Sequence, residues 1–273
     1  MLDKNILDQV KGVFASLKSQ ITFAATSKKD DEKKGELQEF LNDIASTSEK
    51  LSVSFTEEEN AQLSFKLLKD DNETGITFRG IPNGHEFTSL LLAVLNTDGQ
   101  GKNFPDEAIQ RRIKSLKGEI ALKTYVSLTC TNCPDVVQAL NLMSLINPNI
   151  KHEMVDGGIY QQEVSDLNIQ GVPAVYCNNE SLHIGRGDLG ILLQELEDMV
   201  GSEALENEES IEREYDVIVV GGGPAGASAA IYSARKGLKV GLVAERIGGQ
   251  VNDTTGIQNL ISVPNTNGTQ LAA

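Results

Sequence analysis

The sequence predicts an α/β protein with two related α/β units in tandem, followed by the beginning of a third. Three observations lead to this prediction. Strand and helix patterns alternate along the chain, the series repeats with an offset of about one hundred residues, and a glycine-rich strand–turn–helix motif follows near residue 220. Alternating strands and helices are typical of sheets with helices packed on their faces, so we expect that architecture throughout.

The composition is that of a globular protein with enough apolar residues for a sizeable core. The chain has 273 residues, of which 40% are hydrophobic, and its 39 acidic and 24 basic residues give a net charge of −15. We expect no nucleic-acid partner, because that binding depends on clustered cations. Residues 1–20 do not resemble a secretory signal, and the uncharged run at 217–234 contains four glycines and a proline. No membrane association is therefore expected, and the cytoplasm is the expected location.

The first unit is expected within residues 1–115. Short apolar runs predict three strands, and helical periodicity predicts two helices. In chain order these are residues 21–25 (strand), 37–44 (helix), 51–55 (strand), 63–68 (strand) and 87–95 (helix). At the first strand-to-helix turn the chain reads Thr26-Ser27-Lys28-Lys29, which has no redox capacity. Glu86, next to the second helix, is interpreted as an acid at a helix N-terminus.

The second unit, expected within residues 116–200, repeats the order strand, helix, strand, strand, helix. Its elements are predicted at 120–128 (strand), 136–145 (helix), 150–155 (strand), 174–177 (strand) and 189–200 (helix). The matching order favours two duplicated domains, and two unrelated α/β units are the alternative.

An acidic linker and an incomplete third unit are expected after residue 200. Residues 201–214 contain six glutamates and one arginine, a composition typical of a solvated tether. The remaining residues, 215–273, predict a strand at 215–220, a helix that ends near Gly237 and a strand at 238–244. Doubly wound nucleotide-binding domains typically need about 100 residues or more, so we expect this unit to be incomplete.

Two of the three cysteines, Cys130 and Cys133, form a C-x-x-C pair where a strand gives way to a helix. Free N–H groups and the helix dipole favour a thiolate there, so Cys130 is the expected attacking sulfur. Cys133, one turn further along, is expected to resolve a mixed disulfide.

A zinc site is an alternative that would need two more ligands, and inert packing cysteines are another. We expect no metal, and we interpret Cys177 as a small buried hydrophobic residue. The three histidines, which form no ligand cluster, are interpreted as surface or packing residues; they are His85, His152 and His183.

The segment Gly171-Val172-Pro173, which precedes a predicted strand, is a candidate for a cis peptide bond. Together with the cysteine pair it resembles the thioredoxin and glutaredoxin fold, in which a cis-proline loop faces the dithiol. By that resemblance Val172 and Pro173 belong to the catalytic site with Cys130 and Cys133. The sequence departs from thioredoxins at Thr124, where they carry a buried aspartate, so the proton relay assigned to that acid cannot be carried over.

The motif G-x-G-x-x-G occupies Gly221 to Gly226, between a predicted strand and a predicted helix. Such glycines allow a tight turn and close backbone approach, and the helix N-terminus can hold a pyrophosphate. Glu245, nineteen residues after Gly226, is placed to accept hydrogen bonds from a ribose. A glycine-rich turn without a ligand is the alternative. The segment Gly248-Gly249-Gln250 and Asn259 resemble the flavin-contacting segment of thioredoxin-reductase-like flavoproteins, which favours FAD over NAD. The expected cofactor-binding residues are Gly221, Gly222, Gly223, Pro224, Ala225, Gly226, Glu245, Arg246, Gly249, Gln250 and Asn259.

The order of these features resembles one family as a whole, the flavoprotein component of bacterial alkyl hydroperoxide reductase. The similarity includes Ser127-Leu128-Thr129-Cys130-Thr131-Asn132-Cys133-Pro134-Asp135-Val136-Val137-Gln138-Ala139-Leu140-Asn141-Leu142-Met143 and Gly223-Pro224-Ala225-Gly226. The resemblance implies tandem thioredoxin-like domains followed by the start of a Rossmann-like FAD-binding domain.

The family resemblance also implies a route for electrons. They would pass from NADH to FAD, to a dithiol in the flavin domain, to Cys130 and Cys133, and then to a peroxiredoxin partner, the peroxide-reducing component of alkyl hydroperoxide reductase. The sequence has no second C-x-x-C and no NADH-binding fingerprint, so we expect an incomplete FAD site and no NADH oxidation by this chain alone. A homodimer is expected only with a complete flavin module. A general protein disulfide reductase and a non-catalytic docking module are the alternative functions.

Overall fold

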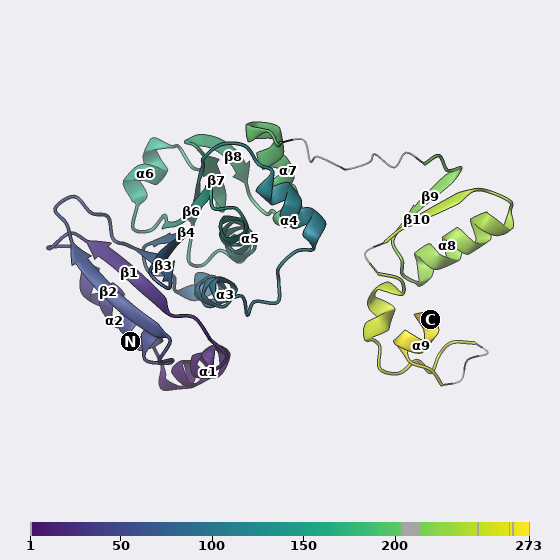
Figure 1. Ribbon diagram of the computed structural model, residues 1–273, viewed down its shortest axis with the longest axis horizontal. Helices are drawn as coiled ribbons and strands as arrows, with labels where there is room; N and C mark the ends of the chain where they lie inside the picture. The colour runs from purple at the N-terminus through teal and green to yellow at the C-terminus, as the bar shows by residue number, and fades with distance from the viewer. Residues whose placement is uncertain (1, 204–212, 245, 262, 264, 273) are drawn as a thin grey trace. The chain divides into compact units, whose positions relative to one another are not determined.

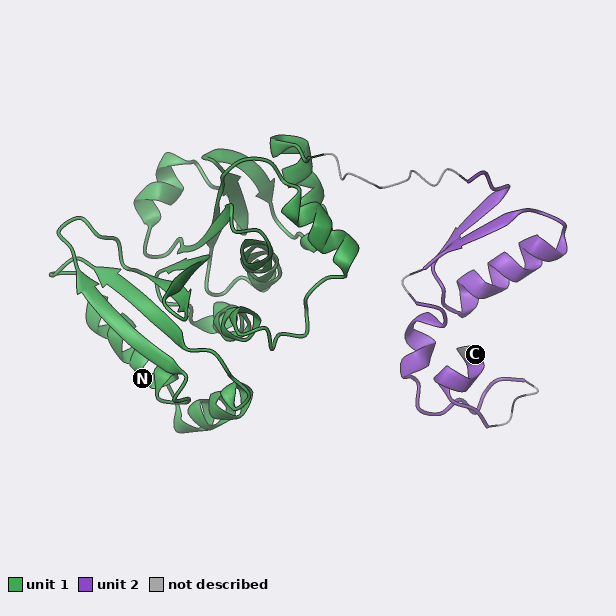
Figure 2. Ribbon diagram, in the orientation of Figure 1, with its two compact units in different colours: residues 1–206 green, residues 207–273 purple. Residues whose placement is uncertain are grey.

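The computed structural model describes residues 2–203, 213–244, 246–261, 263 and 265–272, and the chain divides into two compact units, 1–206 and 207–273 (Figure 2). Strands and helices alternate in both units (Figure 1), which confirms the predicted α/β class. Most of the acidic segment expected at 201–214 lies outside the described residues.

Unit 1 contains all the elements expected between residues 21 and 200, together with six that the sequence analysis did not anticipate. Its helices are α1 (Lys4–Phe14), α2 (Lys34–Ala45), η1 (Gly84–Glu86, a 3-10 turn), α3 (Phe87–Thr97), α4 (Glu107–Lys114), α5 (Cys133–Ile146), α6 (Gln161–Asp166) and α7 (Leu189–Val200). Its strands are β1 (Ile21–Ser27), β2 (Leu51–Glu57), β3 (Ser64–Lys69), β4 (Asn72–Arg79), β5 (Ile120–Val126), β6 (Ile150–Asp156), β7 (Ala174–Cys177) and β8 (Glu180–Ile184). The unexpected elements are α1, β4, η1, α4, α6 and β8. Strand β8 is a short strand at the edge of the sheet with no fully buried residue, whereas α1 and α4 are amphipathic helices that bury Val10, Phe14 and Ile113.

All eight strands of unit 1 form one sheet, in the order β2-β1-β3-β4-β6-β5-β7-β8. The first half of this sheet contains β1 to β4, and the second half contains β5 to β8. Each half contributes a parallel pair followed by two antiparallel strands, so the halves repeat the same strand order and directions. Strands β4 and β6 join the halves in parallel, from Ile76 opposite His152 to Arg79 opposite Val155. The boundary between the halves at residues 115 and 116 stays a prediction. Ile113 of α4 precedes that boundary in the chain, but its side chain lies in the core of the second half.

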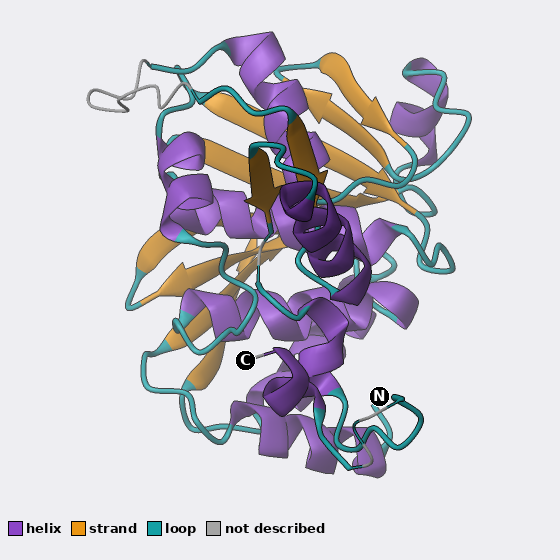
Figure 3. Ribbon diagram, turned by 90° about the vertical axis from the view of Figure 1, so that its right-hand side faces the viewer, coloured by secondary structure: helices purple, strands orange, loops and turns teal. Residues whose placement is uncertain are grey.

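Helices pack against this sheet and close two apolar cores (Figure 3). The rings of Phe23, Phe65 and Phe78 lie in the first core, with centroids of successive rings 5.9 and 5.2 Å apart. The second core lies between α5, α7 and strands β5 to β7. Helices α3 and α5 contact each other, so the cores adjoin at the level of the β4–β6 pairing.

A buried ionic cluster crosses the junction between the halves. The guanidinium of Arg79 on β4 donates to both carboxylate oxygens of Glu163 on α6, in one contact at 3.0 Å. The Tyr125 hydroxyl donates to the same carboxylate at 3.0 Å, and the Tyr160 ring centroid lies 4.2 Å from the guanidinium carbon. Only 4% of the Arg79 side chain is exposed, so these partners must compensate for the cost of burying its positive charge.

Unit 2 is a β-α-β unit with two short helical segments after it. Strands β9 (Val217–Val220) and β10 (Val240–Val243) are parallel, and α8 (Pro224–Arg235) connects them. The chain continues through the 3-10 turn η2 (Gly249–Asp253) and α9 (Gly268–Ala272). The strands and helix expected here are confirmed. None of the described helices is long and apolar enough to span a bilayer.

The buried cluster makes a prediction about stability. We expect Glu163→Gln to lower the free energy of unfolding by about 3 kcal/mol, because it leaves the Arg79 charge buried without its principal partner. Urea denaturation measures this loss. Glu73→Gln is the matched control, since it breaks an ion pair with Lys66 in which both side chains are half exposed, and it is expected to cost less than about 1 kcal/mol. Equal losses in both variants would contradict this account of the junction.

Candidate active site

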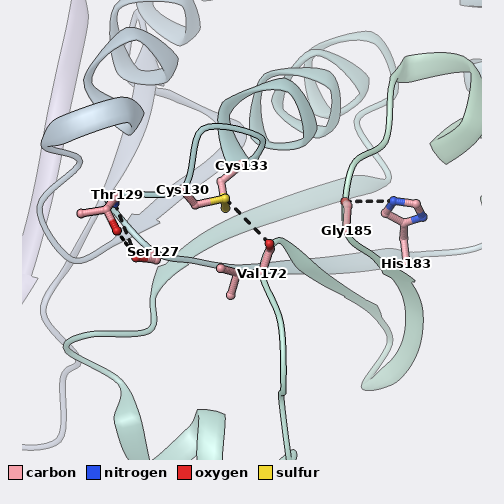
Figure 4. Close-up of a disulfide and its surroundings, with 7 residues drawn as sticks. All are labelled: Ser127, Thr129, Cys130, Cys133, Val172, His183 and Gly185. Carbon is pink, nitrogen blue, oxygen red and sulfur yellow. Dashed lines mark hydrogen bonds between the residues drawn. A yellow bond between two sulfur atoms is a disulfide. The ribbon is translucent and has the colours of Figure 1, made fainter.

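The two cysteines of the C-x-x-C pair are joined by a disulfide bond in the loop between β5 and α5 (Figure 4). Helix α5 begins at Cys133, with Asn132 as its N-cap and Pro134 in its first turn. Cys130 therefore lies just ahead of the helix, near the unpaired N–H groups of its first turn. This placement agrees with the predicted strand-to-helix turn and is suited to stabilising a thiolate.

The two sulfurs of the disulfide differ in exposure. Cys130 is half buried, whereas Cys133 is fully buried in the apolar core of the first half, together with Val137 and Leu90. Of the two, Cys130 is the one that a protein partner can reach. This difference in exposure is what the predicted roles require, with an outer sulfur that attacks and an inner sulfur that resolves.

The peptide bond between Val172 and Pro173 is cis, as the sequence predicted. The loop that contains it places the Val172 carbonyl oxygen 3.8 Å from the Cys130 sulfur (Figure 4). Residues 42 positions apart in the chain thus meet at the disulfide. The four predicted catalytic residues, Cys130, Cys133, Val172 and Pro173, are brought together at one place, and their catalytic roles stay predictions.

Thr124, which replaces the thioredoxin aspartate, belongs to a buried polar chain. Its hydroxyl lies 2.8 Å from Nε2 of His152, and Nδ1 of His152 lies 2.7 Å from Oδ1 of Asn141. Because the amide oxygen can only accept, Nδ1 carries the proton and Nε2 accepts from Thr124. Burial lowers the pKa of His152 to about 3, so the ring is neutral. His152 is a packing residue, as expected, but one with both nitrogens hydrogen-bonded, which ties α5 to β5 and β6.

Glu86 is a buried acid beside the cysteine loop that sequence reasoning did not single out as part of the site. Its carboxylate makes no capping hydrogen bond at the start of α3, and neither oxygen has a partner within hydrogen-bonding geometry. Burial raises the pKa of Glu86 to about 7, and the nearby Ser89 hydroxyl offsets part of this shift. The turn η1 contacts α5, and the His85 N–H donates to the Leu128 carbonyl oxygen at 3.1 Å. The only sequence signal was an acid directly before a strongly apolar helix.

The glycine-rich motif of unit 2 forms a close-packed backbone cradle. Gly221 has φ +114°, and a Cβ atom on Gly226 would collide with the Gly221 carbonyl oxygen. Helix α8 begins at Pro224 with Gly223 as a cap that has no side chain, so the N–H groups of its first turn are not covered by a capping side chain. A cavity of about 450 Å³ adjoins this turn and is lined by Gly222, Gly223 and Pro224 together with apolar residues from α8, η2 and α9. The cradle fits the pyrophosphate of a dinucleotide.

The remaining expected cofactor residues, which follow β10, differ in contacts and exposure where the structure describes them. Glu245 lies outside the described residues. The Arg246 guanidinium donates to Asp253 at 3.2 Å, whereas Gln250 and Asn259 are exposed. Gly249 has φ +54° and starts η2. Their contacts with a cofactor stay predictions, as do those of Gly221, Ala225 and Gly226. Among the described residues no three His, Cys, Asp or Glu side chains gather in a way that could hold a metal ion.

A disulfide with one accessible cysteine, opposite a cis-proline loop, defines a thioredoxin-like disulfide redox protein, here followed by a dinucleotide-type β-α-β unit. The structure of the N-terminal domain of the alkyl hydroperoxide reductase AhpF from Enterococcus faecalis matches with a TM-score of 0.67 and 32% identity, over 72% of this chain and 100% of that one. The chain belongs to the AhpF family of alkyl hydroperoxide reductases, which confirms the resemblance seen in the sequence.

Further comparisons agree with this assignment. The chain is 45% identical over all 273 residues to the alkyl hydroperoxide reductase AhpF of Staphylococcus aureus (strain MRSA252), and 46% identical to a protein named NADH dehydrogenase from Bacillus subtilis (strain 168). It spans 52% of the length of each of these relatives. The family model for FAD dependent oxidoreductases matches residues 216–263, which supports a flavin in this family. A protein disulfide oxidoreductase from Aeropyrum pernix, 16% identical with a TM-score of 0.66 over 73% of this chain and 95% of that one, shares the fold of unit 1.

The difference in burial predicts the order in which the cysteines react. In the reduced protein we expect iodoacetamide to label Cys130 faster than Cys133 or Cys177 by roughly an order of magnitude, because only Cys130 combines access with a helix start. Burial also raises the pKa of the Cys177 thiol. Mass-spectrometric mapping of the labelled sites measures the order. Cys177→Ser should leave the labelling rate of Cys130 unchanged, and labelling of Cys177 first would overturn the assignment.

The buried carboxyl of Glu86 predicts a pH dependence of stability. The carboxyl stays protonated to about pH 7 in the folded protein, whereas in the unfolded chain it ionises near the ordinary glutamate pKa of 4.5. Its contribution is therefore present below pH 4.5 and is lost as the pH rises through about 7, by roughly 3 kcal/mol. Glu86→Gln should abolish this loss and be more stable than wild type at pH 8.

Urea unfolding of the wild type and the Glu86→Gln variant at pH 5 and pH 8 measures this difference. Glu119→Gln, which replaces an exposed carboxylate, is the control and should follow the wild type at both pH values. A Glu86→Gln variant that loses as much stability as wild type between these values would show that Glu86 ionises normally.

Proposed function

We propose that this chain transfers electrons, in the cytoplasm, from a dithiol of a flavin domain to the disulfide of a peroxiredoxin, as part of an alkyl hydroperoxide reductase. The observation that carries this proposal is the pairing of an accessible Cys130 with a buried Cys133 opposite the Val172 carbonyl. Family membership supports the same reaction. A peroxiredoxin reduced in this way can reduce a further peroxide.

The reaction is two consecutive thiol–disulfide exchanges. The Cys130 thiolate attacks one sulfur of the oxidised partner, forms a mixed disulfide and displaces the partner's other sulfur as a thiolate. The Cys133 thiolate then attacks the Cys130 sulfur, which closes the intramolecular disulfide and releases the second partner thiolate. Two electrons pass to the peroxiredoxin. The flavin-domain dithiol returns them by the same two steps in reverse.

The backbone beside Cys130 supports a mode of docking for the partner. The Val172 carbonyl lies at the sulfur, and β7 begins directly after Pro173. An extended segment of the partner can make main-chain hydrogen bonds at such a site, which aligns its disulfide with the attacking sulfur. We assign this positioning role to Val172 and Pro173.

We also propose that unit 2 belongs to an FAD-binding domain whose electrons come from NADH in the whole protein. Bound FAD supplies two-electron transfer between the nicotinamide and a dithiol. Gly222, Gly223 and the first turn of α8 would hold its pyrophosphate, and Glu245 would bind its ribose. The glycine cradle and the adjoining cavity support this assignment.

The proposed mechanism predicts which variant captures the partner. Cys133→Ser cannot resolve the mixed disulfide, so the reduced variant should form a covalent complex with oxidised peroxiredoxin through Cys130. Cys130→Ser should form none, because the two remaining cysteines, Cys133 and Cys177, are both buried. A non-reducing gel shows the complex. Equal capture by both variants, or none by Cys133→Ser under conditions where wild type reacts, would exclude this mechanism. Faster reduction of insulin than of peroxiredoxin by wild type would favour a general disulfide reductase.

A further inference from the structure

His183, at the end of β8, connects α7 to the turn beside the cis-proline loop. Its side chain is about 10% exposed, and both ring nitrogens face oxygen atoms. Nδ1 lies 3.0 and 3.1 Å from the carboxylate oxygens of Glu195 on α7, and Nε2 lies 3.1 Å from the Gly185 carbonyl oxygen. A carboxylate and a carbonyl oxygen both only accept, so the two contacts together require a proton on each ring nitrogen, and the second contact is a bond donated by Nε2. The interpretation of His183 as a surface or packing residue missed these bonds.

The turn that His183 contacts is bonded to the active-site loop. The Gly185 N–H donates to the Pro173 carbonyl oxygen at 2.8 Å, and the preceding carbonyl, that of Val172, lies 3.8 Å from the Cys130 sulfur. Figure 4 shows His183 and Gly185 in the surroundings of Val172 and the disulfide. A continuous series of contacts therefore leads from His183 to the reacting sulfur.

The imidazole ring of His183 packs closely against the backbone of this turn. A Cβ atom on Gly187 would lie 2.7 Å from Nε2 of His183, so the absence of a side chain at Gly187 makes room for the ring. Gly185 has φ +96°, a backbone conformation that favours glycine. The turn thus combines two conformationally permissive glycines with one side chain that fixes it.

We propose that His183 is a positioning residue for the exchange reaction. By donating to the Gly185 carbonyl it fixes the turn whose N–H holds Pro173, and this sets the Val172–Pro173 backbone in place to receive a partner at Cys130. The effect on a peroxiredoxin rests on the proposed function. The coupling between His183 and the turn does not, and it can be measured without a partner.

Two substitutions separate this role from a merely structural one. His183→Gln places an amide N–H near the position of Nε2, so it can still donate to Gly185 but loses Glu195. His183→Asn places its amide near Nδ1, so it keeps the contact with Glu195 and loses Gly185. A positioning role through the turn predicts that Gln restores function and Asn does not. A role limited to tying α7 to β8 predicts the reverse.

The partner-independent experiment is hydrogen exchange at the Gly185 amide, measured residue by residue by NMR. We expect the exchange rate to rise roughly three- to tenfold in His183→Asn, the range for loss of one hydrogen bond, and to stay near the wild-type rate in His183→Gln. Glu195→Gln keeps an oxygen that can accept from Nδ1, and it should also exchange like wild type. Thermal unfolding of each variant confirms that it folds.

The second experiment measures single-turnover reduction of oxidised peroxiredoxin by the pre-reduced chain at increasing partner concentration. The half-saturating concentration should rise roughly three- to tenfold in His183→Asn, while the limiting rate stays near wild type, because docking is weakened but both sulfurs are intact. His183→Gln should match wild type in both values.

The outcomes distinguish the two proposals. Equal behaviour of the Asn and Gln variants in both experiments, or an unchanged Gly185 amide in His183→Asn, would overturn the positioning role. The same would follow if Glu195→Gln reproduced the effect of His183→Asn, since the coupling would then run through α7. A wild-type chain that reduces no peroxiredoxin, with Gly185 exchange as expected, would refute the proposed function and leave the positioning role supported.

Discussion

The parallel pairing of β4 with β6 is the contact on which the organisation of unit 1 depends. It joins two four-stranded halves into one sheet, so each half covers an edge of the other that would otherwise present unpaired N–H and C=O groups. Arg79 lies at the end of this pairing, and its guanidinium contacts Glu163, Tyr160 and Glu153 of the second half. Because a buried guanidinium is costly without partners, this cluster also fixes how the halves fit together.

This junction explains how a half without redox cysteines contributes to the redox site. The start of α5 does not pack only into its own half, because Cys133 and Val137 are buried in the first core. Glu86, from the first half, is buried in a segment that contacts the same helix. The exposure difference between Cys130 and Cys133, on which the proposed order of the two exchange steps rests, results from packing between the halves.

Much of the site could be predicted because its signals are local. The C-x-x-C turn, the residue before Pro173 and the spacing of Gly221, Gly223 and Gly226 each act through backbone geometry within a few residues. The strands and helices that were predicted lie within a few residues of their observed ends. The missed strand β8 is a short edge strand, and β4 begins with the polar residues Asn72 and Glu73, so neither has a clear apolar alternation.

The sequence by itself determined the α/β class, the repeated order of elements, the disulfide-forming turn and the glycine cradle of unit 2. The tertiary structure alone decided that the halves share one sheet, that Glu86 is buried without a hydrogen-bond partner, and that His183 reaches the turn bonded to Pro173. The physical reason is that burial and hydrogen-bond partners are set by residues far apart in the chain. The pKa of a carboxyl or the fixing of a loop depends on which distant groups exclude water from it, and no local pattern encodes that.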